Sequence, residues 1–221
     1  MLKLSPITKI NEMFVPSAVK NHPNTALRSI DYITIHTTDN YNVTATAKAH
    51  ANYLFGGSSG KTVSWHYSVD DKEIWRSFGD KQACWHAGNS IGNNTSIGIE
   101  ICVNNRSVFR QGCVNAAWLT ASLLTKYKLG FDRCVQHNFW SAKNCPETLR
   151  SGMWGVTWTD FTAMVNTFLH DGYRSSKITD VRQAIHKLAE NGIISSPEYW
   201  INNHGRLQYL DLLIINMANK I

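Results

Sequence analysis

The 221-residue sequence predicts an α/β fold, in which helices flank a central mixed β-sheet, followed by a small all-helical C-terminal domain. Up to about residue 170, short segments with apolar residues at every second position alternate with segments of helical spacing. Beyond about residue 178, only the helical spacing remains. Hydrophobic residues make up 43% of the chain and charged residues 17%, which is an ordinary globular composition. Strands that alternate with helices are typical of a sheet covered by helices.

The predicted strands place polar residues on one face of the sheet. The strand-like segments are residues 30–38, 62–78, 96–103 and 133–137. In the first, Ile33 and Ile35 point to one face and His36 to the other, because side chains alternate along a strand. In the third, an apolar row lies opposite Glu100. The second segment reads as a hairpin with its turn at Asp70–Lys72.

Helices are expected at about 44–54, 114–128 and 159–169. Gly130 closes the second of them, and Gly172 stands where the C-cap of the third is expected. The composition then shifts at residues 170–178, so we place a domain boundary there. The first domain is predicted to span 1–172 and the helical domain 176–221.

The C-terminal segment carries its own helix signals. Thr179 caps a segment of helical spacing that Gly192 closes, and Ser196 followed by Pro197 marks a second helix start. Leucine, isoleucine and methionine residues between 207 and 221 recur at the spacing of an amphipathic helix. The segment is therefore expected to fold as a compact helical unit.

The net charge of +6 suits a polyanionic partner, such as nucleic acid or an acidic cell-wall polymer. The sequence has neither a tight Lys/Arg cluster nor a nucleic-acid-binding motif, so nucleic acid is not the expected partner. No apolar run approaches the roughly 20 residues of a membrane span, and integral membrane contact is not expected either.

The N-terminal segment lacks the continuous apolar stretch of a secretory signal, so synthesis and folding in a cytosol are expected. An odd number of cysteines, five, fits that expectation and argues against a disulfide framework. Most of them are interpreted as small buried apolar residues.

Four polar residues lie at strand ends or on the less apolar face of a strand: His36, His66, Glu100 and His137. A buried polar group costs free energy unless it is paired, so several on one face indicate a site, although a lone histidine is more often structural. His137 and Cys145 are eight residues apart across one loop. Together with a histidine from another strand, they match a three-ligand zinc arrangement that leaves a fourth position open for water. This spacing alone is moderately specific.

Several ordered motifs give the sequence a family resemblance. They are IHTT at 35–38, AHANYL at 49–54, SWHYSVDD at 64–71, WHAGN at 85–89, SIGIEIC at 96–102 and QHNFWSAKNCPETLR at 136–150. Between about Asp31 and Arg150 the chain resembles the zinc-dependent N-acetylmuramoyl-L-alanine amidases of the amidase-2 family. That family includes phage lysozyme-type amidases and the peptidoglycan recognition proteins.

The resemblance implies an activity and a set of site residues. The activity is hydrolysis of the amide bond between N-acetylmuramic acid and L-alanine in bacterial peptidoglycan, with Zn2+ as cofactor. His36, His137 and Cys145 correspond to the zinc ligands. Glu100 corresponds to the general base for the attacking water, and Lys143 to the cation that stabilises the tetrahedral oxyanion.

Three further residues are weaker substrate-binding candidates. Some family members carry a catalytic Tyr where this chain has Trp65, so no chemical role is assigned to Trp65, which either stacks on substrate or packs in the core. His86 is interpreted either as a histidine at the rim of the cleft, next to a ligand or to substrate, or as an anchor of its own loop. Asn89 could bind sugar or peptide, but Asn is also common in turns.

Residues 176–221 more weakly resemble helical modules that follow amidase domains in phage endolysins. Wall binding, subunit pairing and simple stabilisation of the first domain all remain open. With the absent signal, the motifs predict a phage or prophage endolysin that accumulates in the host cytoplasm and reaches the wall after release through a separate membrane pore.

Two other functions are weighed. In a cysteine amidase, Cys145 would be the nucleophile and His137 its base. In common cell-wall cysteine peptidases the Cys precedes the His, whereas here it follows. A recognition module that binds peptidoglycan without cutting it typically lacks the Cys ligand, which this chain retains.

Overall fold

A computed structural model of the protein describes residues 5–176, 181–203, 214, 215 and 217–219. Its centre is a six-stranded sheet in the order β1-β4-β3-β5-β2-β6. The strands are β1 (Ile10–Glu12), β2 (Tyr32–Thr37), β3 (Tyr67–Val69), β4 (Ile74–Arg76), β5 (Ser96–Ile101) and β6 (Cys134–Gln136). All pairings are parallel except the β3–β4 hairpin. The predicted mixed sheet is therefore confirmed.

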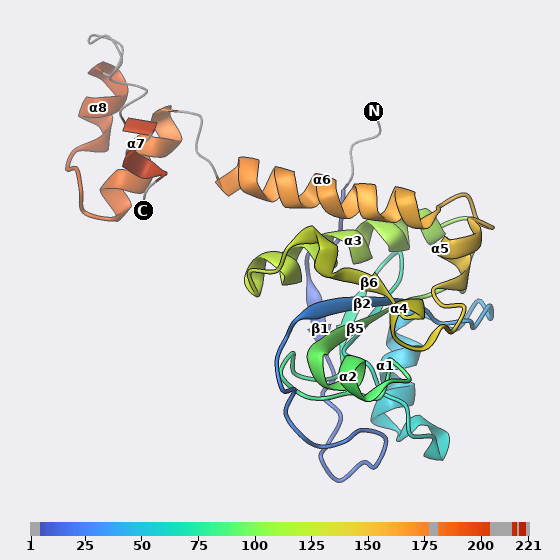
Figure 1. Ribbon diagram of the computed structural model, residues 1–221. Helices are drawn as coiled ribbons and strands as arrows, with labels where there is room; N and C mark the ends of the chain where they lie inside the picture. The colour runs from blue at the N-terminus through green and yellow to red at the C-terminus, as the bar shows by residue number, and fades with distance from the viewer. Residues whose placement is uncertain (1–4, 177–180, 204–213, 216, 220–221) are drawn as a thin grey trace. The chain divides into compact units, whose positions relative to one another are not determined.

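Helices lie on both sides of this sheet (Figure 1). The helices of the described residues are, in chain order, α1 (Ala47–Phe55), α2 (Ser90–Thr95), α3 (Phe109–Lys126), α4 (Asn138–Ser141), α5 (Glu147–Ser151), α6 (Trp158–Ser176), α7 (Val181–Glu190) and α8 (Pro197–Asn203), with 3-10 turns at Ser58–Gly60 and Phe131–Arg133. The last two, α7 and α8, belong to the second compact unit described below and not to the layers around the sheet. In Figure 1, α3 and α6 lie above the sheet, and α1 and α2 lie below it. The α/β class predicted from the sequence is thus the observed one.

The apolar row of the central strands forms the core. Ile33, Ile35, Ile97, Ile99 and Ile101 are all fully buried. Full burial of each such side chain stabilises the fold by roughly 1.5–3 kcal/mol. Because side chains alternate along a strand, the residues between these isoleucines face the opposite side, where the polar groups gather.

Several helix boundaries differ from the prediction. Helix α1 starts at Ala47, three residues after the predicted 44, and α3 ends at Lys126, so Gly130 does not close it. Helix α3 starts at Phe109, five residues before the predicted 114, and carries Gly112 where its first turns pass close to the backbone of Asp70. A Cβ at that position would make an ordinary van der Waals contact with the Asp70 backbone at 3.5 Å, and the glycine does not interrupt the helix. The predicted end of the third helix at Gly172 is wrong, because α6 continues to Ser176. A glycine inside a helix costs only about 1 kcal/mol relative to alanine, which a long helix tolerates.

The chain divides into two compact units, Met1–Phe168 and Leu169–Ile221, so the division falls within α6. In the second unit, residues from α7 and from the segment near the C-terminus form a small core of Ala184, Ile185, Leu188, Ile214 and Ala218. Helix α8 begins at Pro197 as predicted, and Gly192 after α7 has a positive φ of 69°. The Thr179 cap and most of the helix predicted at 207–221 lie outside the described residues.

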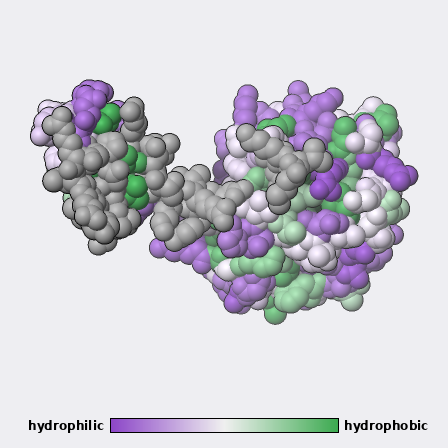
Figure 2. Space-filling view, turned by 90° about the horizontal axis from the view of Figure 1, so that it is seen from above, coloured by the Kyte–Doolittle hydropathy of each residue, from purple (hydrophilic) through white to green (hydrophobic). Residues whose placement is uncertain are grey.

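None of the described helices combines the length and the apolar character needed to cross a membrane. On the face seen in Figure 2, hydrophobic patches of the first unit are interspersed among hydrophilic residues. Such a mixed surface is ordinary for a face in contact with water.

Candidate metal centre and cleft

Three parallel strands bring the predicted site residues to one edge of the sheet. His36 near the end of β2 pairs in register with Glu100 near the end of β5. His137 directly follows β6, which pairs with β2 on its other side. The carboxyl ends of parallel strands are where open α/β sheets commonly bind ligands.

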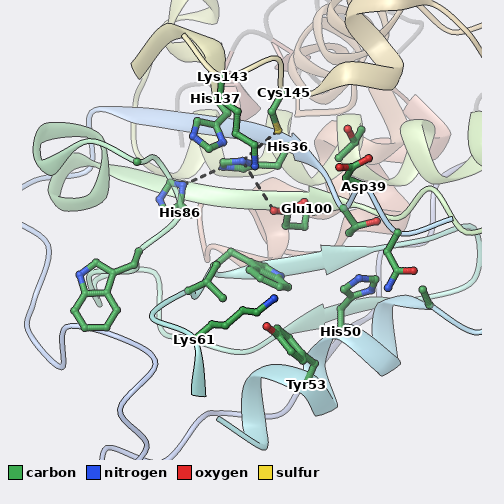
Figure 3. Close-up of a pocket in the computed structure, with 18 of the residues that line it drawn as sticks. His36, Asp39, His50, Tyr53, Lys61, His86, Glu100, His137, Lys143 and Cys145 are labelled. Atoms are coloured by element: carbon green, nitrogen blue, oxygen red, sulfur yellow. Dashed lines mark hydrogen bonds and ion pairs between the residues drawn. The ribbon is translucent and has the colours of Figure 1, made fainter. Parts of the chain in front are cut away.

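A cleft of about 810 Å³ opens over this edge (Figure 3). His36, Glu100, His137, Lys143 and Cys145 all line it, so every residue of the predicted catalytic set faces one space. The dashed lines in Figure 3 join His36 to three of its neighbours, which makes it the most connected side chain among those drawn.

The three predicted ligands converge. One ligand atom from each of His36, His137 and Cys145 lies within 4.8 Å of the others, and all three residues are buried. The Nδ1 atom of His36 lies 3.7 Å from Sγ of Cys145. Both ring nitrogens of His137 are buried without a well-formed hydrogen bond. Unpaired buried nitrogens cost free energy unless a ligand satisfies them.

The loop between His137 and Cys145 is closed by its own hydrogen bonds. The backbone N–H of Asn138 donates to the carbonyl of Cys145 at 2.9 Å, and its side-chain amide donates to the carbonyl of Lys143 at 2.9 Å. The N–H of His137 donates to the carbonyl of Ile35 at 3.2 Å. These bonds fix the loop to the sheet, so two residues eight apart face the same point.

This trio fits a zinc ion. Two imidazoles and a thiolate are a donor set typical of zinc, and three protein ligands leave a fourth position open. Burial lowers the pKa of His137 to about 4, helped by the charge of Lys143, so the ring is neutral at pH 7 and its nitrogens can act as donors. Burial also raises the pKa of the Cys145 thiol to about 12. A dication among these ligands would stabilise the thiolate and offset that effect.

Glu100 is the carboxylate of the site. Its side chain is 14% exposed, and Oε1 lies 4.0 Å from Nδ1 of His36. Its Oε2 atom is buried without a hydrogen bond. Burial raises the pKa of Glu100 to about 8, against the opposing effect of the Lys143 charge. With that pKa the carboxyl is mostly protonated at pH 7 in the metal-free protein, and a dication held by the trio would favour its ionised, proton-accepting form.

The other predicted residues occupy varied positions. Trp65 is buried, donates from Nε1 to Ser68 Oγ at 2.8 Å, and packs in a core cluster while its edge lines the cleft. Asn89 caps α2 by accepting from the N–H groups of Ile91 and Gly92. The core position of Trp65 and the capping role of Asn89 account for both residues structurally, so their contact with substrate stays a prediction.

The two remaining histidines differ in their relation to the trio. His86 lines the cleft, and its Nδ1 lies 3.0 Å from Nε2 of His36. His66 is buried behind the cleft, with Nε2 donating to the carbonyl of Gln82 and Nδ1 accepting from the N–H of Gly98. His86 therefore contacts a member of the trio, whereas His66 joins the backbone at Gln82 to the backbone of β5 at Gly98.

The sequence interpretation missed one arm of the cleft. It is lined by residues from α1 and the segment after it, among them His50, Tyr53 and Lys61. Lys61 and Tyr53 are both labelled among the lining side chains in Figure 3. In the sequence, Ala45, Ala49 and Tyr53 follow one another at intervals of four, and all three line the cleft. That spacing was the available signal for a cleft-facing helix surface.

Fold and site together define an α/β domain with a buried His–His–Cys donor set at the floor of a cleft. A family model described as N-acetylmuramoyl-L-alanine amidase matches residues 26–148, and the chain belongs to this amidase-2 family. It is 39% identical over 159 residues to the N-acetylmuramoyl-L-alanine amidase XlyA of Bacillus subtilis strain 168, covering 71% of this chain and 51% of XlyA. It is also 38% identical over 143 residues to the N-acetylmuramoyl-L-alanine amidase CwlH of the same strain. That match covers 63% of this chain and 56% of CwlH.

The solved structures agree with this assignment. A mutant endolysin from Bacillus subtilis superimposes with a TM-score of 0.66 at 38% identity, covering 72% of this chain and 99% of that one. The chain spans about half the length of the curated relatives it matches.

Proposed function

We propose that the protein is a zinc-dependent N-acetylmuramoyl-L-alanine amidase. It hydrolyses the amide bond between N-acetylmuramic acid and L-alanine in bacterial peptidoglycan. The observation that carries the proposal is the unpaired Oε2 of Glu100 beside the His36–His137–Cys145 trio, in one cleft. Family membership supports the choice of bond.

The chain's own residues divide the work of hydrolysis. Glu100 accepts a proton from the attacking water, since its Oε2 has no competing partner. Lys143 lines the same cleft and its charge already acts on Glu100 and His137, so it is placed to stabilise negative charge that develops on the substrate carbonyl oxygen. Zn2+, when bound by the trio, supplies a Lewis acid that polarises the carbonyl and lowers the pKa of water to about 7.

A Cys145 nucleophile is the competing mechanism. It requires a thiolate, whereas burial raises the pKa of this thiol to about 12. A neutral thiol beside two neutral imidazoles is a poor nucleophile but a good site for a dication. The donor set thus favours the metal mechanism.

The biological role that fits this activity is that of a phage or prophage endolysin acting on the host cell wall. The second compact unit has its own small core, and we propose that it binds the wall or pairs two subunits. Segments 1–172 and 176–221 would then be a catalytic and an accessory domain.

The test is digestion of purified cell walls, followed by mass spectrometry of the new ends. Free L-alanine amino termini with intact glycan strands are expected. Dialysis against a chelator should abolish the activity, and added Zn2+ should restore it, whereas iodoacetamide treatment of the zinc-loaded enzyme should have little effect. New ends within the peptide or the glycan strand, or full activity without metal, would refute the proposal.

A further inference from the structure

We propose that His86 is a positioning residue that fixes the tautomer of His36, so that the lone pair on His36 Nδ1 faces the metal. The inference rests on the metal site of the proposed function. It concerns a residue that the hydrolysis steps above do not use. His86 is buried, with 6% of its surface exposed, and its ring stands edge-on to that of His36.

The backbone of β5 sets the tautomer of His86. Its Nε2 lies 3.3 Å from the carbonyl oxygen of Ser96. A carbonyl oxygen can only accept, so Nε2 of His86 must carry the hydrogen. A neutral imidazole has one N–H, so Nδ1 of His86 is then a bare acceptor. The His86 ring is buried with its centroid 5.9 Å from that of a second imidazole, His66, an environment that disfavours a charged ring.

The tautomer of His86 in turn determines the tautomer of His36. His36 Nε2 lies 3.0 Å from the bare Nδ1 of His86, so this nitrogen of His36 must donate. Nδ1 of His36 is therefore the nitrogen without a hydrogen. It points to Cys145 Sγ at 3.7 Å and to Glu100 Oε1 at 4.0 Å, which is the side of the predicted metal. A carbonyl of the sheet thus determines which nitrogen of the ligand is available.

The position of His86 is itself tightly specified. A Cβ at Gly98 would lie 2.8 Å from two atoms of the His86 ring, so only glycine leaves room for the ring on this strand. The backbone N–H groups of His86 and Ala87 both donate to Oδ1 of Asn93, at 3.0 and 2.7 Å. Strand β5 therefore supplies Glu100, the space for His86 at Gly98 and the orienting carbonyl at Ser96.

The experiment compares zinc affinity in two variants of the full chain, measured by competition with a chromophoric chelator. His86→Leu keeps the bulk but removes the acceptor, and a loss of about 10–100-fold in zinc affinity is expected, as is typical when a hydrogen-bond partner of a metal ligand is removed. His86→Asn can keep an oxygen acceptor where Nδ1 stood, and zinc affinity within about threefold of the parent is expected. His50→Leu is the matched control, because His50 is a buried histidine of the same cleft that bonds to Thr46 and not to the trio.

A spectroscopic readout separates positioning from general damage. Two-bond 15N–1H NMR correlations on the metal-free protein should give His36 as the pure Nε2–H tautomer in the parent. A mixture of tautomers is expected in His86→Leu. Gly98→Ala provides a second route to the same effect, since the added methyl group displaces the His86 ring without touching its chemistry.

The outcomes are distinguishable from those of the proposed function. If the parent chain binds no zinc, the proposed function fails, and this inference fails with it. If the parent binds zinc and His86→Leu binds it equally well, the inference alone is wrong. An Nδ1–H tautomer of His36 in the metal-free parent would also overturn it.

Discussion

Individual side chains in the cleft are held neutral by burial, which makes the donor set dependent on its ligand. Both ring nitrogens of His137 lack a well-formed hydrogen bond, and burial raises the pKa of the Cys145 thiol to about 12. The unpaired nitrogens cost free energy as they stand, and a bound cation would satisfy them and stabilise the thiolate. Substitution of the proposed metal ligands should therefore have the clearest measurable effect.

The first prediction at this scale concerns Cys145→Ser. A hydroxyl is a far poorer zinc ligand than a thiolate, so zinc affinity should fall by more than the roughly 10–100-fold seen when a ligand merely loses its hydrogen-bond partner. Elemental analysis and chelator competition measure the effect. Cys113→Ser is a matched control, since Cys113 is also fully buried but lies in α3 away from the cleft. Stoichiometric, tightly held zinc in Cys145→Ser would remove this residue from the ligand set.

The second prediction concerns Glu100→Gln, which preserves size while removing the proton acceptor. Turnover on purified walls should fall by about 10²–10⁴-fold with zinc content unchanged, since that range is typical for loss of a general base. Lys143→Ala should also slow turnover while leaving the zinc in place, and Lys143→Arg should recover part of the rate because it keeps the charge. A Glu100→Gln variant within a few-fold of the parent rate would exclude Glu100 as the base.

At the scale of elements, a charged cluster ties α3 to the hairpin. Asp80 is 3% exposed and bonds to Tyr67 of β3, to Arg76 of β4, and to Lys126 and Tyr127 at the end of α3. Burial alone would raise the pKa of this carboxyl, but the bonds from Lys126 and the two tyrosines lower it to about 2. The acid is thus ionised and fully satisfied.

Asp80→Ala should destabilise the fold by about 3 kcal/mol, near the low end of the roughly 3–5 kcal/mol for breaking a buried ion pair, because Lys126 is largely exposed. Urea unfolding measures the loss, and zinc stoichiometry in native buffer should not change. Asp132→Ala is the control, since Asp132 is 76% exposed in its pair with Arg133 and should change stability by less than about 1 kcal/mol. Equal stabilities of the two variants would show that the cluster does not hold α3.

Local signals explain which elements could be predicted. The β3–β4 turn is encoded nearby, because Oδ1 of Asp70 accepts from the N–H groups of Lys72 and Glu73. Strand β1 was missed because its three residues become a strand only by pairing with β4, far along the chain. Helix α2 was missed because it has no apolar period, and its start depends on the Asn89 cap.

In the candidate site, too, some features could be predicted from the sequence and others could not. The ligands, Glu100 and Lys143 lie in motifs with fixed spacing, so the sequence predicted which residues face one cleft. The contact between His36 Nε2 and His86 Nδ1 could not be predicted, because it depends on the space at Gly98 and on the carbonyl of Ser96, both in β5. Contacts between segments that are distant in the chain produce no repeating pattern in the sequence, so the sequence cannot reveal them.

For the whole molecule, the buried histidines predict a loss of stability in acid. Burial lowers the pKa of His66 to about 4, below its ordinary value of 6.5, so between these values the unfolded chain binds the extra proton. The contribution of His66 is therefore fully present above pH 6.5 and is lost as the pH falls to about 4, a change of about 3 kcal/mol. Protonation would also place a hydrogen on Nδ1, which accepts from Gly98.

The measurement is urea unfolding of the metal-free protein between pH 4 and 7. His66→Gln should reduce the slope of the free energy of unfolding against pH. His186→Gln, at an exposed position in α7, should leave the slope unchanged. Identical slopes in the parent and His66→Gln would mean that His66 does not contribute to acid sensitivity.

Removal of the second unit is the last prediction. A chain of residues 1–176, which keeps all of α6, should stay folded, retain zinc and hydrolyse small muropeptides. It should lose most of its lysis of intact cells if the second unit binds the wall, because tethering raises the effective concentration of the site at an insoluble substrate. Lysis equal to that of the full chain would argue against wall binding, and light scattering would then test for loss of a dimer. Aggregation would mean that the second unit stabilises the first.

The order of strands in the sheet has a consequence for how the protein is made. Strand β2 lies between β5 and β6, yet both of these follow it in the chain, and Cys145 lies 109 residues after His36. During synthesis β2 therefore leaves the ribosome before either of its sheet neighbours and cannot pair until they emerge. Sheets built from such non-local pairs also fold slowly. The donor set becomes complete only when the last loop has emerged. On the proposed function, a nascent chain interrupted before this loop would therefore lack a complete metal site and would be inactive.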